Sequence, residues 1–310
     1  MIAVYIFLSL VVLVMIAAYV CYRLAFSVSK QSRESLLLMP DTEQYTPYAA
    51  LTSQMIRDAL AIPYEPINIP SYDGLPLYGK CYLASPEAPW LIMFHGYRSG
   101  AERDFSGGLP FGIESGFNVL LVDQRAHGKS GGRCLTFGIK ERHDCLSWVE
   151  YVCARTKNTA KIVLYGMSMG AATVLMATAL ELPENVVGIV ADCGYTSPSA
   201  IVKKVLRDRH LPMFPTYALL WLGGMLYGGF DLEAASAVSA MDQCDVPILF
   251  IHGEDDRFVP CDMGRENYVH CRSPEKELLT VPNAGHGMSY MVDKKAYLHT
   301  VSTFFKTVLV

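Results

Sequence analysis

The sequence has little charge. Asp, Glu, Lys and Arg make up 18% of its 310 residues, and the formal net charge at pH 7 is −4. Lysine and arginine form no long run, so the electrostatic footprint of nucleic-acid binding is missing. The nine cysteines include no Cys-x-x-Cys pair and no paired His/Cys spacing, which argues against a zinc site. We therefore expect neither a nucleic-acid partner nor a bound metal.

Charge is missing altogether at the start of the chain. No charged side chain occurs from Ile2 to Tyr22, and the first is Arg23. These residues would extend about 31 Å as a helix, which matches the hydrocarbon core of a bilayer. No Lys or Arg precedes the run, and it is longer than the apolar region of most signal peptides. We favour a single transmembrane anchor over residues 1–22 rather than a cleaved signal.

Positive charges follow this segment and do not precede it. Arg23, Lys30 and Arg33 come after it, whereas only the α-amino group comes before. The positive-inside rule then predicts a single-pass protein of the cell membrane whose remaining chain lies on the cytoplasmic face. The odd, unpatterned set of cysteines agrees with a reducing compartment.

The remainder divides into a connector and one larger domain. Residues 23–62 form the connector, which is polar around 40–43 and contains a possible short helix near 48–61. The domain, 63–310, begins with two strand-like runs around the turn Asp73-Gly74. Six further apolar runs of strand length follow: Trp90–Phe94, Phe117–Val122, Lys161–Tyr165, Val186–Ala191, Val246–Ile251 and Glu277–Val281. Helical segments separate most of them, which predicts an α/β fold with a mostly parallel sheet and helices on both faces.

A glycine-flanked serine carries the sharpest chemical signal. Gly166-Met167-Ser168-Met169-Gly170 follows one predicted strand and precedes an apolar helix. A tight strand-to-helix turn projects the serine hydroxyl clear of the backbone, and side chains at the flanking positions would clash. We expect Ser168 to be a nucleophile. We expect the N–H groups of Met169 and Tyr97, the latter in the loop after Trp90–Phe94, to form an oxyanion hole.

Four His-Gly pairs offer candidate bases. They begin at His95, His127, His252 and His286, and only His286 follows both the serine and an acidic loop, the order typical of this arrangement. We interpret the other three as loop-packing residues. The acid should follow the strand Val246–Ile251, where Glu254, Asp255 and Asp256 all occur. Position alone does not choose among these three carboxylates.

From about residue 65 to 310 the chain resembles bacterial membrane-anchored α/β hydrolases of the prolyl-oligopeptidase-like and serine-aminopeptidase-like groups. The resemblance rests on these motifs: His95-Gly96-Tyr97, the run Asp123 to Ser130, Gly166 to Gly170, the run Asp192 to Ser197, the loop 252–260, and Gly285-His286-Gly287. The family loop H-G-x-x-D-x-x-V-P implies that the acid is Asp256. The resemblance also implies an α/β-hydrolase fold and a Ser-His-Asp catalytic triad.

One crossover is too long for a single helix. It lies between Ala191 and Val246 and contains Leu211–Phe230, a stretch without charge. A membrane crossing there would put Ser168 and His286 on opposite sides of the bilayer. We expect instead a small helical lid over about 198–240. In that lid Phe214, Tyr217 and Trp221 would bind substrate; the alternative is a core helix with no substrate role.

These features predict a serine hydrolase that cleaves a carboxylic ester through an acyl-serine intermediate, with no metal or organic cofactor. The apolar lid favours a lipid-like or otherwise apolar acyl group. Two alternatives stay open: a serine peptidase resembling aminopeptidases, and a non-catalytic, membrane-associated binding protein on the same fold.

Overall fold

The computed structural model describes residues 1–28, 33–38 and 42–310, so Lys30 and part of the predicted polar stretch 40–43 lie outside the described residues. One sheet of eight strands, in the order β1-β2-β4-β3-β5-β6-β7-β8, forms its centre. The strands are β1 Glu65–Pro70, β2 Pro76–Tyr82, β3 Trp90–Phe94, β4 Asn118–Asp123, β5 Ile162–Met167, β6 Val186–Asp192, β7 Ile248–Gly253 and β8 Lys276–Val281. β1 and β2 form the predicted hairpin, β2 pairs antiparallel with β4, and every other pairing is parallel. The predicted fold class is confirmed.

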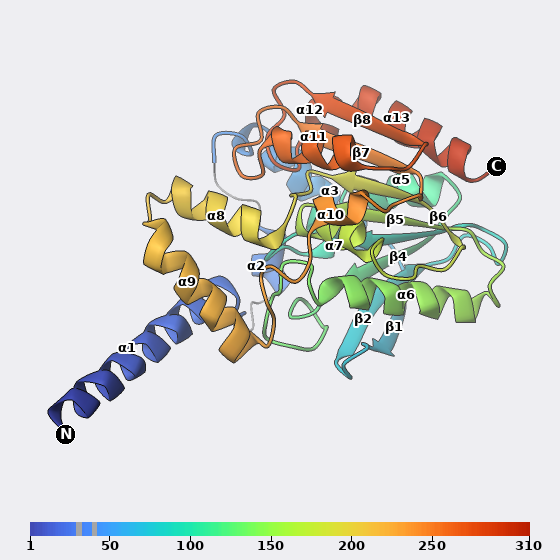
Figure 1. Ribbon diagram of the computed structural model, residues 1–310. Coiled ribbons are helices and arrows are strands. Elements are labelled where there is room, and N and C mark those ends of the chain that lie inside the picture. Colours follow the sequence, from blue (N-terminus) through green and yellow to red (C-terminus); the bar gives the residue numbers. More distant parts are fainter. Residues whose placement is uncertain (29–32, 39–41) are drawn as a thin grey trace.

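Helices cover both faces of the sheet (Figure 1). They are α1 Ile2–Ala25, α2 Arg33–Leu37, η1 Thr46–Tyr48, α3 Ala49–Ala61, α4 Ala101–Asp104, α5 Gly108–Glu114, α6 Glu141–Arg155, α7 Met169–Ala177, α8 Pro198–Asp208, α9 Met213–Gly223, η2 Gly224–Gly228, α10 Ala237–Met241, α11 Cys261–His270, α12 Ser289–Val292 and α13 Lys294–Val308. Alternate residues of a strand enter different cores. Ile92 packs with the residues of α6 and α7, whereas Leu91 and Met93 pack with those of α5 and α13. Burial on both faces explains why these strands are uniformly apolar.

The N-terminal helix projects from the body of the protein, and its C-terminal end enters the domain (Figure 1). Phe26 directly after α1 is fully buried, and its ring lies edge-to-face against Phe230 at 5.1 Å and Phe137 at 5.8 Å. The Leu135 N–H donates to the carbonyl of Phe26, and the Val28 N–H donates to Arg133. The start of the connector is therefore part of the core and not a free polar linker. The reason is that burial of the apolar Phe26 side chain lowers the free energy of the folded state.

The segment 198–240 forms α8, α9, η2 and α10, and α9 crosses α1 near the C-terminal end of α1 (Figure 1). Gly223 at the end of α9 lies so close to Ala18 of α1 that a Cβ there would stand 2.5 Å from the Ala18 carbonyl oxygen. The hydroxyl of Tyr227 donates to the carbonyl of Met15 over 3.1 Å. The uncharged stretch thus finds its main partner in the N-terminal helix.

Candidate active site

Ser168 occupies the sharp turn between β5 and α7. Its backbone has φ 56° and ψ −115°, a strained conformation for a residue with a side chain. Both flanking glycines are required: a Cβ on Gly166 would collide with the carbonyl of Gly170, and one on Gly170 would collide with the carbonyl of Phe94. The turn therefore holds the serine hydroxyl at the carboxyl end of the sheet, clear of the backbone.

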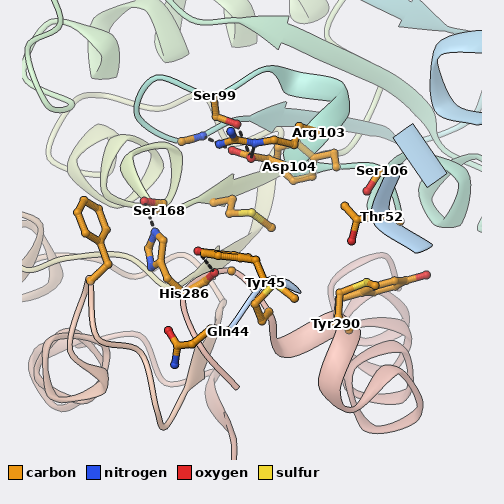
Figure 2. Close-up of a pocket in the computed structure, with 18 of the residues that line it drawn as sticks. Gln44, Tyr45, Thr52, Ser99, Arg103, Asp104, Ser106, Ser168, His286 and Tyr290 are labelled. Atoms are coloured by element: carbon orange, nitrogen blue, oxygen red, sulfur yellow. Dashed lines mark hydrogen bonds and ion pairs between the residues drawn. The ribbon is translucent and has the colours of Figure 1, made fainter. Parts of the chain in front are cut away.

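Ser168, His286 and Asp256 form a hydrogen-bonded series. The Nε2 atom of His286 lies 2.9 Å from Ser168 Oγ, a contact drawn in Figure 2, and its Nδ1 atom lies 2.7 Å from Asp256 Oδ2. The other Asp256 oxygen accepts the backbone N–H groups of Phe258 and Val259 at 2.9 and 2.8 Å. Glu254 instead accepts the hydroxyl of Thr280. Of the three carboxylates in the loop, Asp256 is the one that faces the imidazole.

Burial and charge act in opposite directions on this pair. Burial alone would raise the pKa of Asp256, but the charge of His286 and hydrogen bonds from His286 and His252 hold it below its ordinary value. Burial alone would lower the pKa of His286, but the Asp256 carboxylate raises it above its ordinary value. The Asp256 carboxylate thus stabilises the protonated form of the His286 imidazole, which makes the neutral imidazole a stronger base.

The loop after β3 brings a second set of backbone donors beside the serine. A Cβ on Gly96 would lie 3.2 Å from Ser168 Cβ, so this loop passes within contact distance of the nucleophile position. The next residue is Tyr97, and its backbone N–H has no hydrogen-bond acceptor among the described residues. Met169 begins α7, where N–H groups have no intrahelical acceptor. The two residues expected to supply oxyanion donors directly follow Ser168 and Gly96 in the chain.

A buried carboxylate holds this loop, and the sequence analysis missed it. Asp104 of α4 accepts hydrogen bonds from the N–H of Gly96 at 2.7 Å and from the hydroxyl of Ser99 (Figure 2). The Nε atom of Arg103 lies 3.2 Å from Asp104 Oδ1. Burial would raise the pKa of Asp104, but Arg103, Ser99 and their neighbours lower it. Asp104 belongs to no motif with the serine, so spacing offered no signal for it.

The three remaining His-Gly histidines bind backbone groups, as predicted. His95 accepts the N–H of Gln124 at 3.1 Å, and His127 accepts the N–H of Arg98 at 3.0 Å. His252 lies 2.8 Å from the carbonyl of Val259. Each imidazole fixes a loop around the site and none contacts Ser168.

A cavity of about 730 Å³ opens from Ser168 (Figure 2). Its walls come from the connector, the β3–α4 loop, the start of α5, and the loops around Phe258 and Met288. The lining includes Gln44, Tyr45, Thr52, Arg103, Phe105, Ser106, Met167, Arg209, Arg257, Phe258, Met288, Tyr290 and Met291.

The connector completes this cavity, which the sequence analysis did not foresee. The Tyr45 hydroxyl donates to the backbone carbonyl of His286 at 2.8 Å, and the Gln44 amide donates to the carbonyl of Asp255 at 2.9 Å. Burial raises the pKa of Tyr45 well above its ordinary value, so its hydroxyl remains a donor. The loops that carry Asp256 and His286 are thus held by one short segment.

A model of the family described as alpha/beta hydrolase fold matches residues 89–219. The protein YqkD of Bacillus subtilis is 29% identical over 238 residues, covering 76% of this chain and 77% of that protein. Protein bem46 of Schizosaccharomyces pombe is 27% identical, covering 78% and 76%. The solved structure of the Pyrococcus furiosus esterase Pf2001 matches with a TM-score of 0.65 at 24% identity, over 82% of this chain and 94% of that chain. The chain has the α/β-hydrolase fold.

The family match and the similar solved structure agree on this fold. Among the described residues, α1 is the helix long and apolar enough to cross a membrane. Its place near the N-terminus is compatible with the expected anchor.

The structure does not bring the expected lid residues to the cavity. Phe214 is 83% exposed, the Trp221 indole donates to Asp231 at 2.8 Å, and Tyr217 donates to Glu233. None of the three lines the cavity beside Ser168. The reason is that α9 packs on α1. The substrate-binding role expected for Phe214, Tyr217 and Trp221 stays a prediction.

Two buried groups lie beneath the site. The carboxyl of Asp192, at the end of β6, accepts the hydroxyl of Tyr297 at 2.8 Å, and burial raises its pKa to about 6. The next residue, Cys193, has a thiol whose sulfur lies within 4.8 Å of ligand atoms of Asp256 and His286. Both nitrogens of His286 are already engaged by Asp256 and Ser168, which argues against a metal ion held by Cys193, Asp256 and His286.

Proposed function

We propose that the protein is a serine hydrolase that cleaves carboxylic esters, with Ser168, His286 and Asp256 as its catalytic triad. The observation that carries the proposal is the continuous series from Asp256 through His286 to the Ser168 hydroxyl, at 2.7 and 2.9 Å, at the base of a substrate-sized cavity. The esterase among the similar structures agrees with this chemistry.

In the proposed reaction, His286 Nε2 takes the proton of Ser168 Oγ as that oxygen attacks the ester carbonyl carbon. The N–H groups of Met169 and Tyr97 stabilise the oxyanion of the tetrahedral intermediate. His286 then protonates the leaving alcohol, and an acyl-serine remains. Water attacks this acyl-enzyme after giving a proton to His286, and the acid leaves as the proton returns to Ser168. Asp256 orients the imidazole throughout and stabilises its charge.

The lining of the cavity favours an ester with an apolar acyl group. Phe105, Met288 and Met291 offer apolar surface within the same cavity as Ser168. A peptidase that recognises a free amino group needs a carboxylate aimed at that group. Among the described lining residues, the acids are Asp104, which already binds Gly96 and Ser99, and the exposed Glu43. This supports the ester over the aminopeptidase alternative.

The test uses a fluorophosphonate probe and p-nitrophenyl esters of graded chain length. The wild type should react covalently at Ser168 and turn over butyryl or longer esters faster than acetyl ester. Ser168→Ala should lose labelling and reduce turnover by about 10⁴ to 10⁶. An unlabelled wild type would favour the non-catalytic binding protein, and a preference for aminoacyl amides would favour the peptidase.

We further propose that α1 anchors the protein in the cell membrane with the domain on the cytoplasmic face. The helix is 24 residues long, and most of its side chains are exposed and apolar. Flotation of the full-length protein with lipid vesicles tests the anchor. Protease accessibility of the domain in right-side-out and inverted vesicles tests its orientation.

A further inference from the structure

We propose that α9 and η2 lie in the interfacial region of the bilayer beside α1, as a second membrane-binding element of the domain. The inference rests on the proposed anchor and is independent of the hydrolase reaction. No charged residue occurs from Leu211 to Phe230. Large apolar side chains are exposed along this stretch: Leu211, Met213, Phe214, Trp221, Met225 and Leu226. An apolar surface of this kind requires a partner.

The length of α1 identifies that partner. Residues 1–14 are all exposed, and contact with η2 begins at Met15, whose carbonyl accepts the Tyr227 hydroxyl. The free part of the helix from residue 2 to 14 extends only about 20 Å. The hydrocarbon core of a bilayer is about 30 Å thick. If α1 crosses it, the last 10 Å or so must come from the part of α1 that α9 and η2 cover.

The two elements are packed too tightly to separate at the membrane surface. Ala18 is fully buried, and Gly223 of α9 approaches its carbonyl so closely that no side chain would fit. The ring of Tyr227 lies edge-to-face on Tyr19 at 5.1 Å and also contacts Tyr22 at 6.0 Å. Small residues that let helix backbones approach are typical of contacts within membranes. Wherever residues 15–22 of α1 lie, α9 lies at the same depth.

The outward face of α9 has the chemistry of an interfacial helix. Ala218, Trp221 and Leu222 of α9 follow the spacing i, i+3 and i+4, and so share one stripe. The exposed Met225 follows in η2. The Trp221 indole N–H donates to Asp231 while the residue stays 37% exposed, a combination of polar partner and exposed surface typical of tryptophans at membrane interfaces.

Basic residues flank the apolar stretch on the side of the domain. Arg207 and Arg209 precede it, and Arg23 closes α1. Their positive charges would attract the phosphate groups of anionic lipids. Asp231 and Glu233, which follow the stretch, reduce the local positive charge. The pattern of apolar stripe, interfacial indole and basic flank commits this surface to lipid.

The chain offers its own reporter for this contact. It has three tryptophans, of which Trp90 and Trp148 are buried in the core and only Trp221 is exposed. Full-length protein is reconstituted into phosphatidylcholine and phosphatidylglycerol vesicles whose acyl chains carry bromine close to the headgroup. Bromine should quench the emission of the wild type, and Trp221→Phe should lose the quenchable part. Phe214→Asp should reduce quenching, whereas Val269→Asp, on the remote and 71% exposed Val269 of α11, should not.

Several results would overturn the proposal. One is vesicle-bound protein that is not quenched, or quenching that survives unchanged in Trp221→Phe. Another is a stable dimer in detergent that Phe214→Asp dissociates, which would assign the surface to a second copy of the chain. Failure of the wild type to float with vesicles would reject the anchor itself. Ester hydrolysis is measured on the same samples, so a failure of the proposed reaction is seen separately.

Discussion

The phenolic hydroxyl of Tyr45 donates a 2.8 Å hydrogen bond to the backbone carbonyl of His286. Tyr45 lies in the segment just before η1, and His286 lies in the loop after β8. His286, the proposed base, is therefore held by a segment that precedes the α/β domain in the sequence. We infer that Tyr45 is a positioning residue.

Tyr45→Phe should lower kcat while leaving KM nearly unchanged. A hydrogen bond of this kind contributes about 0.5–1.5 kcal/mol, so we expect a decrease of roughly 2- to 12-fold. Tyr48→Phe is the matched control, because no hydrogen bond of the Tyr48 hydroxyl is found among the described residues. Equal kinetics of the two variants would show that Tyr45 only fills space.

Asp256→Asn should reduce turnover by about 10⁴, because an amide cannot stabilise the charged imidazole and favours the wrong tautomer. Asp255→Asn should retain activity, since the side chain of Asp255 does not face His286. Steady-state rates on a p-nitrophenyl ester measure both. A crippled Asp255→Asn with an active Asp256→Asn would reverse the assignment.

The pH dependence of kcat/KM follows from the pKa of His286. The base must be neutral, and the Asp256 carboxylate raises its pKa, so activity should fall with decreasing pH through a midpoint above about 6.5. Asp192, whose pKa is raised to about 6, also titrates near this range. If His286 sets the midpoint, Asp192→Asn should keep this limb and lower the midpoint only slightly, because the Asp192 carboxylate is a minor cause of the raised pKa of His286. A midpoint that disappears in that variant would assign the limb to Asp192.

Asp104→Ala should lower kcat by about 10- to 100-fold, because the Gly96–Tyr97 loop loses the carboxylate that holds it, and loss of one oxyanion donor costs about 10²–10³. Asp58→Ala on the exposed face of α3 serves as the control. Burst amplitudes with a slow substrate would separate loss of rate from loss of active protein. If folded Asp104→Ala kept an unchanged kcat, the Tyr97 N–H would not depend on Asp104 for any role in the oxyanion hole.

Truncation should distinguish the anchor from the core. A chain without residues 1–24 keeps Phe26, whereas one without 1–28 loses its buried ring, comparable to a Phe→Ala change of about 3–5 kcal/mol. Urea unfolding of the two chains measures the difference in free energy of unfolding. Equal stability would mean that the ring packs without contributing to the fold.

The sequence predicted the sheet well, since uniformly apolar runs such as Trp90–Phe94 are typical of strands buried on both faces. Ser168 and His286 followed from glycine-rich turns and from their order along the chain. Tyr45 and Asp104 were not predictable. Each acts through a hydrogen bond to the backbone of a distant loop, and such a contact imposes no spacing on the sequence.

The sequence analysis expected substrate to cover the uncharged stretch Leu211–Phe230, and the structure shows that α1 covers part of it. Hydropathy reports how much apolar surface a helix has and not which surface it meets. The contact between Gly223 and Ala18 depends on the docking of α1, which no local pattern encodes.

The bond between Tyr45 and His286 joins residues 241 positions apart. During folding, contacts between residues so far apart in sequence form late, because closing the long loop between them costs conformational entropy. During synthesis the Tyr45 segment leaves the ribosome well before the His286 loop. If His286 is the proposed base, a nascent chain that has not yet emerged as far as residue 286 would have no working base, so hydrolysis could not begin before that loop is made.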